Sequence, residues 1–286
     1  MRLAALQMCS GTRPAHNLEA LDRLVGEAVG LGATYVLSPE VTVAFAENGE
    51  ALRKVAHPWP DNPDVARASE IARRHGVVLH LGSLAIALPD GRFANRSVLF
   101  TAAGDVAATY DKIHLFDATL PGILAYRESE TYRGGEHAVL TEAPGFRLGM
   151  TICYDLRFAS LYAALASAGA EVIAVPAAFT VPTGEAHWET LVRARAIETG
   201  CFVVAAAQGG QHENGRATWG HSMIVDPWGR VVAAINGDKT GVIVAEVDLK
   251  DVSDARERVP SLANSRQFSL TVKLVGAESA PKEQES

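Results

Sequence analysis

The stretch GAEVIAVPAAF, residues 169–179, decides the fold, because a similar stretch occurs much earlier in the chain. Residues 32–41 read GATYVLSPEV and share with it the opening Gly-Ala and a proline seven positions later. Each stretch is a nearly continuous apolar run between two helical patterns, which is typical of a strand in an α/β fold. The repeat predicts a chain built from two similar halves.

The elements predicted around the two stretches follow the same order in both halves. Strands are predicted at residues 2–7, 32–39, 76–82, 147–153, 169–179 and 201–208. Helices are predicted from apolar periodicity at residues 17–31, 64–74, 159–168 and 188–199. Two hairpins also correspond, at 97–108 and 222–234, and Asp90-Gly91 predicts a further hairpin turn.

The predicted strands are nearly continuously apolar, so both faces of each sheet should be covered. Two such halves predict an α/β fold of four layers, an α-β-β-α sandwich. We expect a single domain over residues 1–270 and a C-terminal extension over 271–286. Its end, GAESAPKEQES, is polar and rich in small residues, which predicts disorder.

The composition favours a soluble globular protein, with 48% hydrophobic and 21% charged residues among 286. A net charge of −7 and the absence of a basic stripe argue against a nucleic-acid partner. No apolar run reaches the ~18 residues of a membrane span, and the N-terminus MRLAALQMCSG has too short an apolar core for a secretory signal. Cys9, Cys153 and Cys201 are few and widely spaced, so we expect the reducing cytoplasm.

Three polar residues of different chemistry follow predicted strands. Glu40 follows TYVLSP, Lys112 follows VAATYD, and Cys153 follows RLGMTI. Reactive groups in α/β sheets collect beyond the carboxyl ends of strands. Taken singly, the cysteine could belong to the core and the lysine to the surface, whereas a buried glutamate requires a cationic partner. Together they predict one site.

These three residues suit a nucleophilic cysteine. A free thiol has a pKa of about 8.5 and is mostly protonated at neutral pH. Glu40 would accept its proton, and Lys112 and the helix expected to begin at Cys153 would stabilise the thiolate. Lys112 and the backbone N–H of Tyr154 would stabilise the oxyanion, each donor being worth about a hundredfold to a thousandfold in rate.

The segments SPEV, YDKIHLFD and CYDLRF around these residues resemble the nitrilase (carbon–nitrogen hydrolase) superfamily, over nearly the whole chain. The resemblance implies the four-layer sandwich, a homodimer or larger assembly, and a mechanism without a cofactor. It makes Glu40 the general base, Lys112 the stabiliser of the tetrahedral intermediate and Cys153 the residue that forms a thioester. It also implies a second catalytic glutamate, Glu128 in YRESETY, which would otherwise be interpreted as a solvated loop acid.

The nitrile-cleaving branch places tryptophan and then glutamate after its cysteine, whereas this chain has Tyr154 and Asp155. It resembles instead the amidase-like branch of ω-amidases and deaminated-glutathione amidases, the latter more closely over residues 178–208 and 220–229. The implied reaction converts a small carboxylated ω-amide, first of all deaminated glutathione, to an acid and ammonia. Alternatives are 2-oxoglutaramate, an N-carbamoyl amino acid, or no reaction in a ligand-sensing or scaffolding protein.

Further residues are predicted to bind the substrate. Arg157 lies one helical turn beyond Cys153, where it would bind a substrate carboxylate or form an ion pair with Asp155. Phe179 and Thr180 end a predicted strand and are expected to form the acyl pocket, with Thr183 in the following loop.

Other residues of the chain could supply a different kind of active site. A histidine could serve as the base for Cys153 if it lay within about 3 Å of the thiol. The candidates are His187, His212 and His221. Ser222 in GHSMI lacks the final glycine of a serine-hydrolase elbow and is interpreted as structural. Neither histidines nor cysteines have metal-ligand spacing, so we predict no metal.

Overall fold

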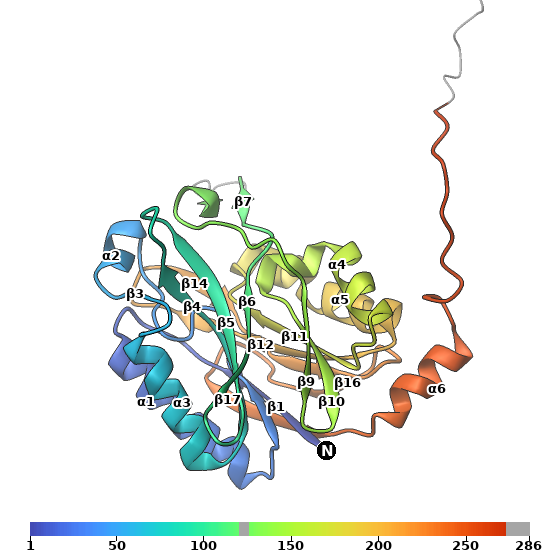
Figure 1. Ribbon diagram of the computed structural model, residues 1–286, viewed down its shortest axis with the longest axis horizontal. Helices are drawn as coiled ribbons and strands as arrows, with labels where there is room; N and C mark the ends of the chain where they lie inside the picture. The colour runs from blue at the N-terminus through green and yellow to red at the C-terminus, as the bar shows by residue number, and fades with distance from the viewer. Residues whose placement is uncertain (120–125, 273–286) are drawn as a thin grey trace, which may run out of the picture.

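The computed structural model describes residues 1–119 and 126–272, and two large β-sheets pack face to face in it (Figure 1). The first sheet has the order β17 (Gly241–Glu246), β1 (Arg2–Gln7), β2 (Tyr35–Leu37), β4 (Val78–Ala87), β5 (Phe93–Phe100) and β6 (Val106–Asp111), with β3 (His57–Pro58) also pairing with β4. The second has the order β16 (Val231–Ala234), β15 (Met223–Val225), β12 (Phe202–Ala207), β11 (Val172–Ala177), β10 (Phe146–Met150) and β9 (Val139–Ala143).

Helices cover the outer face of each sheet. On the first sheet these are α1 (Pro14–Gly30) and α3 (Pro63–His75), and on the second they are α4 (Ala159–Ser167) and α5 (Val181–Thr199) (Figure 1). The helices α2 (Gly49–Arg53) and α6 (Lys250–Arg258) lie outside these layers, and two short ribbons, β7 (Asp117–Ala118) with β8 (Tyr126–Arg127) and β13 (Gly209–Gln211) with β14 (Ala217–Trp219), complete the described strands. The predicted four-layer sandwich is confirmed.

Burial along β1 shows why the strands are continuously apolar. Leu3 and Ala5 belong to the core between the two sheets, whereas Ala4 and Leu6 belong to the core beneath α1 and α3. All four side chains are fully buried, because a sheet covered on both faces leaves neither set of alternating residues in water. The hydrophobic pattern therefore specifies a layer inside the sandwich.

The two stretches that resemble each other form the corresponding central strands β2 and β11, with one difference. The first strand ends at Leu37, so that Ser38, Pro39 and Glu40 leave the sheet, whereas the second continues through its proline to Ala177. Residues 32–41 thereby end in a loop at the edge of the sandwich, whereas residues 169–179 continue as a strand beside that loop.

Two helices begin earlier than their apolar periodicity predicts. The first helix begins at Pro14 rather than residue 17, and α5 begins at Val181 rather than residue 188. Both carry a proline in the first turn, where the missing N–H has no intrahelical partner to lose. A helix start of this kind depends on the backbone conformation that proline favours in the first turn. The spacing of apolar residues carries no information about that conformation.

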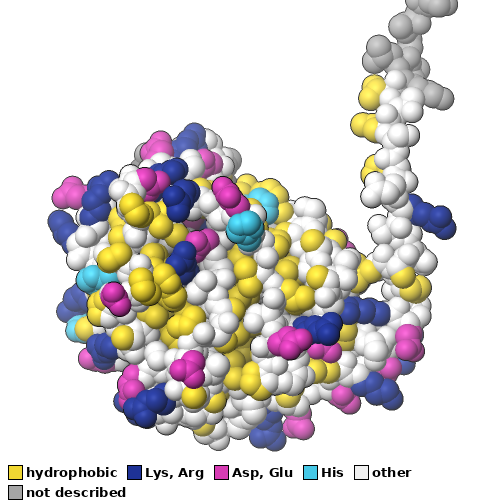
Figure 2. All heavy atoms as spheres, in the orientation of Figure 1, with side chains coloured by type: hydrophobic (Ala, Val, Ile, Leu, Met, Phe, Trp, Pro, Cys, Tyr) yellow, Lys and Arg dark blue, Asp and Glu magenta, His cyan; other side chains and the backbone are white. Residues whose placement is uncertain are grey.

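The chain beyond α6 has no helix or strand up to residue 272 and extends away from the body (Figure 1). Apolar side chains are spaced along it (Figure 2), and Phe268, Leu270 and Val272 are 91%, 85% and 76% exposed. The predicted disordered end, residues 276–286, lies outside the described residues. Within the described chain, no helix is long and apolar enough to cross a membrane.

Gly82 of β4 lies against the Ser38–Glu40 loop and against Pro176 of the second sheet. A Cβ atom there would lie 2.0 Å from the carbonyl oxygen of Ser38, 2.3 Å from that of Pro39 and 2.6 Å from Cβ of Pro176. Two of these atoms belong to the backbone and cannot rotate away. Because Gly82 has no side chain, the loop that carries Glu40 can pack against the second sheet.

Replacing this glycine is expected to harm both stability and activity. Gly82→Ala should cost about 1–3 kcal/mol by overpacking, lower the melting temperature by several degrees, and reduce kcat by displacing Glu40. Thermal unfolding and amide turnover measure the two effects. Gly30→Ala is the matched control, because a Cβ at the end of α1 meets no atom within 4 Å. A Gly82→Ala protein as stable and active as the control would contradict the role of this close approach.

Candidate active site

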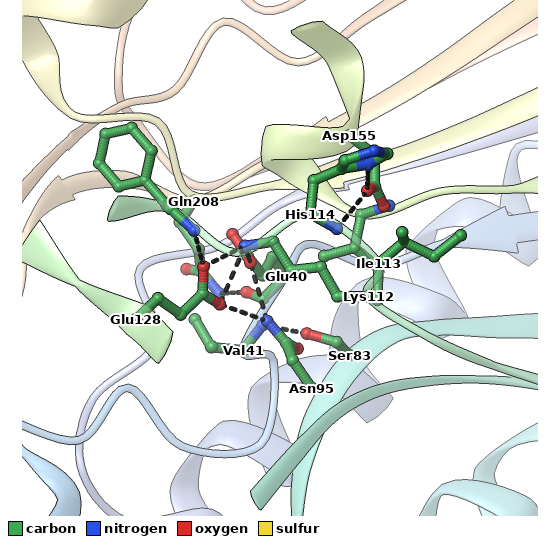
Figure 3. A network of polar contacts seen from close by, with 12 residues as sticks. Glu40, Val41, Ser83, Asn95, Lys112, Ile113, His114, Glu128, Asp155 and Gln208 are labelled. Carbon is green, nitrogen blue, oxygen red and sulfur yellow. Dashed lines mark hydrogen bonds and ion pairs between the residues drawn. The ribbon is translucent and has the colours of Figure 1, made fainter. Parts of the chain in front are cut away.

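A buried lysine lies between two carboxylates at one end of the sandwich (Figure 3). Lys112 Nζ donates to Glu40 Oε1 at 2.8 Å and to Glu128 Oε1 and Oε2 at 3.0 and 2.9 Å. The side chains of Lys112, Glu40 and Glu128 are only 2%, 6% and 15% exposed. Glu128, the first residue of a short 3₁₀ helix (Glu128–Glu130), is therefore held inside the site rather than in solvent.

The Glu40 loop is fixed by contacts on both sides of the carboxylate. The backbone N–H of Val41 donates to Ser83 Oγ at 2.9 Å, and Gln208 Nε2 donates to the backbone oxygen of Glu40 at 2.9 Å. Val41 has φ of 50°, which is rare for a β-branched residue. Strain of this kind costs about 1–3 kcal/mol and persists only where the surroundings determine the conformation.

Cys153 begins a five-residue 3₁₀ helix, Cys153–Arg157, and its φ of 49° turns the chain sharply after β10. Cys153 begins a helix as expected, but this helix is a short 3₁₀ helix, and α4 starts only at Ala159. A single 3₁₀ turn aligns few peptide dipoles, so the N-terminal dipole contributes less to a thiolate than the sequence suggested. The thiol depends on its neighbouring side chains instead.

A fully buried aspartate connects the cysteine turn to the segment that follows Lys112. Asp155 accepts four hydrogen bonds, from Tyr110 Oη at 2.7 Å, Ile152 N at 2.8 Å, His114 N at 3.0 Å and His114 Nδ1 at 2.7 Å. Because its carboxylate is saturated in this way, the alternative ion pair with Arg157 does not form. Asp155 was not identified from sequence as a site residue, although an acid beside the nucleophile was a visible signal.

Burial and a neighbouring carboxylate favour the protonated form of the Cys153 thiol. Burial raises the pKa of Cys153 well above its usual value, and the neighbouring Glu40 carboxylate raises it further, against the opposing effect of Lys112. Burial alone would lower the pKa of Lys112, but Glu128 and Glu40 outweigh it and hold that pKa well above its ordinary value. The site therefore pairs a neutral thiol with a permanent cation and two carboxylates.

A cavity of about 790 Å³ opens onto these groups. It is lined by Glu40, Lys112, Glu128 and Cys153, and also by the five residues predicted to bind the substrate, Tyr154, Arg157, Phe179, Thr180 and Thr183. Thr183 lies in the first turn of α5 and not in a loop as expected, and its hydroxyl lies 2.9 Å from that of Thr180. The volume of the cavity lies within the usual range for small-molecule sites.

Asn95 is a site residue that the sequence reading missed. Its Nδ2 donates to Glu40 Oε1 at 3.0 Å and lies 3.4 Å from Glu128 Oε1, so it links the same two carboxylates as Lys112. Its Oδ1 is the only buried side-chain polar atom without a hydrogen-bond partner within residues 1–119 and 126–272. A polar residue inside the apolar strand FANRSVLF was the signal that could have indicated it.

The histidine alternative is wrong, because none of the three candidates lines this cavity. His187 Nδ1 lies 3.3 Å from both terminal nitrogens of Arg157, while His212 contacts Ser10 and Thr218. His221 contacts the backbone of Trp219.

Ser222 was expected to be structural, and no metal was expected. Ser222 is fully buried, and its hydroxyl bonds to the backbone of Ala207, in keeping with a structural role. The described residues contain no cluster of three or more potential metal ligands, and the absence of a metal stays a prediction.

The sequence pattern of carbon-nitrogen hydrolases matches residues 2–257, which is most of the chain. The chain belongs to the carbon–nitrogen hydrolase family. Among curated proteins, this carbon–nitrogen hydrolase is 41% identical to the deaminated glutathione amidase of Yersinia enterocolitica, with 94% of each chain covered. It is 39% identical to the protein of that name from Bos taurus, covering 92% of this chain and 81% of the relative.

Solved structures give the same result for the fold. The NitFhit protein of Caenorhabditis elegans has a TM-score of 0.85 at 36% identity, and the match covers 93% of this hydrolase but 65% of that longer chain. The Nit3 protein of Saccharomyces cerevisiae, described as a member of the nitrilase superfamily, has a TM-score of 0.84 at 27% identity, covering 94% and 97%. The predicted membership is confirmed, and the hydrolase acts on carbon–nitrogen bonds of amides rather than peptide bonds.

The Asp155 connection is open to a direct test. Asp155→Asn keeps the shape of the side chain but replaces an acceptor by a donor facing N–H and O–H groups, so kcat should fall about tenfold to a hundredfold. Tyr110→Phe removes one of the four hydrogen bonds and should have a smaller effect. Steady-state turnover, together with thermal unfolding of each variant, separates lost positioning from lost folding. Full activity in Asp155→Asn would contradict the role of Asp155.

Proposed function

We propose that this protein is a thiol amidase that cleaves its substrate through a thioester on Cys153. The observation that carries the proposal is the buried Lys112 ammonium held between Glu40 and Glu128 in the cavity that Cys153 lines. A buried cation with two carboxylates has no use in a merely structural loop, because an apolar side chain would fill the space without the cost of desolvation.

In the acylation step, Glu40 accepts the proton of the Cys153 thiol as the sulfur attacks the amide carbon. The carbonyl oxygen becomes an oxyanion, which the Lys112 ammonium and the backbone N–H of Tyr154 stabilise. The carboxylic acid of Glu40 then gives the proton to the departing nitrogen, the carbon–nitrogen bond breaks, and the acyl group remains as a thioester.

In the deacylation step, Glu40 accepts a proton from water, whose oxygen attacks the thioester carbon. The second tetrahedral intermediate collapses, the carbon–sulfur bond breaks, and the proton returns to the sulfur. Glu128 holds the ammonium of Lys112 in place throughout, with Asn95 as a second link between the carboxylates. No cofactor is required, because every proton moves between groups of this chain, the substrate and water.

We propose deaminated glutathione as the substrate, on the names of the curated relatives and on the size of the cavity. This compound is a secondary amide whose nitrogen belongs to a cysteinyl residue. Its hydrolysis therefore releases 2-oxoglutarate and the dipeptide cysteinylglycine, which corrects the expectation of ammonia for this substrate. Ammonia is released only from a primary amide such as 2-oxoglutaramate. The assay must follow the dipeptide amine and the 2-oxo acid.

The other candidates differ in their products. An ω-amidase acting on 2-oxoglutaramate yields ammonia, and hydrolysis of an N-carbamoyl amino acid yields ammonia and carbon dioxide. A ligand-sensing or scaffolding protein releases no product at all. The complete set of Glu40, Lys112 and Cys153 argues against a protein of that kind. The cavity volume of about 790 Å³ favours the larger substrate over the two smaller ones.

Purified protein should hydrolyse deaminated glutathione, and Cys153→Ala should abolish turnover because no other group can form the thioester. Lys112→Met should fold but reduce kcat by about two to three orders of magnitude, as loss of an oxyanion donor does. Chromatographic measurement of 2-oxoglutarate checks both results. Turnover by Cys153→Ala equal to that of the wild type would exclude the mechanism, and a Lys112→Met variant with only a raised KM would exclude the oxyanion role.

We also propose that the protein works in the reducing cytoplasm as a homodimer. Its three cysteines are free thiols. Apolar side chains lie exposed around a shallow hollow beside α5 and α6, with Ile197 at 55%, Trp228 at 50% and Val259 at 57% exposure. Such a patch on a soluble protein is typical of an interface.

Light scattering after size-exclusion chromatography should give about twice the chain mass of 30.3 kDa for the wild type. Trp228→Asp places a charge in the proposed interface and should shift the protein toward the monomer. Val106→Asp is the control, because Val106 is a similarly exposed apolar residue, at 44%, on the edge strand β6. A wild-type monomer, or a dimer unaffected by Trp228→Asp, would contradict this interface.

A further inference from the structure

Three arginines line the cavity without a carboxylate ion pair in the described part of the chain, Arg127, Arg157 and Arg216, and Arg127 Nη1 donates to the backbone oxygen of the adjacent Tyr126 at 2.9 Å. Arg157 follows the cysteine turn, and its guanidinium lies over the ring of Phe179 at 5.4 Å. Arg216 lies in the β13–β14 hairpin, at the exposed rim of the same cavity. Arg157 and Arg216 come from different elements, and Arg157 is the last residue of the 3₁₀ helix that begins at Cys153.

The position of Arg216 is set by aromatic rings rather than by an acid. Its guanidinium lies 5.6 Å from the ring of Phe45 and 5.7 Å from that of Tyr126, and its Nη2 donates to the backbone oxygen of Glu47 at 3.2 Å. One donor is used in this way, while a guanidinium has five. A planar cation held between rings keeps its orientation and retains donors for a bidentate contact with an anion.

The charges lining the cavity differ in sign from those of the whole protein. Four basic residues line it against three acidic ones, whereas the chain as a whole carries −7. Lys112 is already neutralised by Glu40 and Glu128, and these two acids would repel an anionic ligand. A substrate with carboxylates therefore depends on the arginines of the lining.

We infer that Arg216 binds a carboxylate on the leaving group and so selects amides whose amine product is itself an acid. The inference rests on the proposed amidase function and adds to it the recognition of the departing half of the substrate. Arg157 is left for the carboxylate of the acyl half.

The proposed substrate has this arrangement of charges. Deaminated glutathione carries one carboxylate on its 2-oxo acyl half and another at the end of its cysteinylglycine half. The second lies about two residues of extended chain from the scissile carbon, roughly 7 Å, and so needs a cation away from the cysteine. A primary ω-amide has no such group, since its leaving nitrogen departs as ammonia.

The test compares two substrates that share an acyl group. Deaminated glutathione and 2-oxoglutaramate both give 2-oxoglutarate, but only the first has a carboxylate on its leaving group. In Arg216→Met the ratio of kcat/KM for the first over the second should fall about tenfold to a hundredfold, as expected for loss of a charge-assisted contact. Most of the change should lie in KM, and Arg216→Lys should restore part of it.

Two controls separate recognition from general charge effects. Arg13→Met removes an exposed arginine that pairs with Glu213 of the same hairpin region but does not line the cavity, and the ratio should stay unchanged. Deaminated glutathione with its glycine carboxylate converted to an amide should be a poorer substrate of the wild type. Arg216→Met should weaken this amide no further, because the interaction is already absent.

The outcomes distinguish this inference from the proposed function. An equal fall on both substrates, or an unchanged ratio, overturns the role of Arg216 while the amidase function stands. Binding measured by calorimetry to Cys153→Ala gives a readout independent of turnover, and adding Arg216→Met should raise the Kd for deaminated glutathione at least tenfold. Unaltered binding in that double variant also overturns the inference. Absence of turnover of both amides by the wild type rejects the proposed function instead.

Discussion

The interaction on which the site depends is the burial of one ammonium group between two carboxylates. Lys112, Glu40 and Glu128 come from three separate segments of the chain, and each would be costly to bury without the others. Their mutual attraction in a poorly solvated cavity fixes the relative positions of those segments. Burial, together with the Glu40 carboxylate, raises the pKa of the nearby Cys153 thiol against the opposing effect of Lys112.

The surrounding fold supplies the rigidity that this cluster needs. Two chain turns with positive φ, at Val41 and Cys153, lie directly beside reactive residues and are held by buried hydrogen bonds. Asp155 connects the cysteine turn to the backbone after Lys112. The cavity is rigid at the nucleophile and lined by arginines further out, which suits an enzyme that performs one reaction on substrates of defined charge.

Sequence reasoning succeeded where local pattern and global structure agree. The strand Arg2–Gln7 and the helix beginning at Ala159 lie where periodicity places them, because layers of a sandwich have simple burial patterns. It predicted that a helix begins at Cys153, but it did not reveal the positive φ of that residue or the 3₁₀ type of the helix. It also missed Asn95, whose role comes entirely from contacts with residues distant in sequence.

The amino-acid sequence by itself determined the layered architecture and the family, and it indicated the three side chains that we propose to react, because these follow from periodic burial and short local motifs. Tertiary structure alone decided that Glu128 bonds to the buried lysine, that Asp155 binds the cysteine turn rather than Arg157, and that Arg216 lines the same cavity. The physical reason is that hydrogen bonds and charges act over a few ångströms in space. Which groups come that close depends on how the two sheets pack, and a linear pattern does not contain those distances.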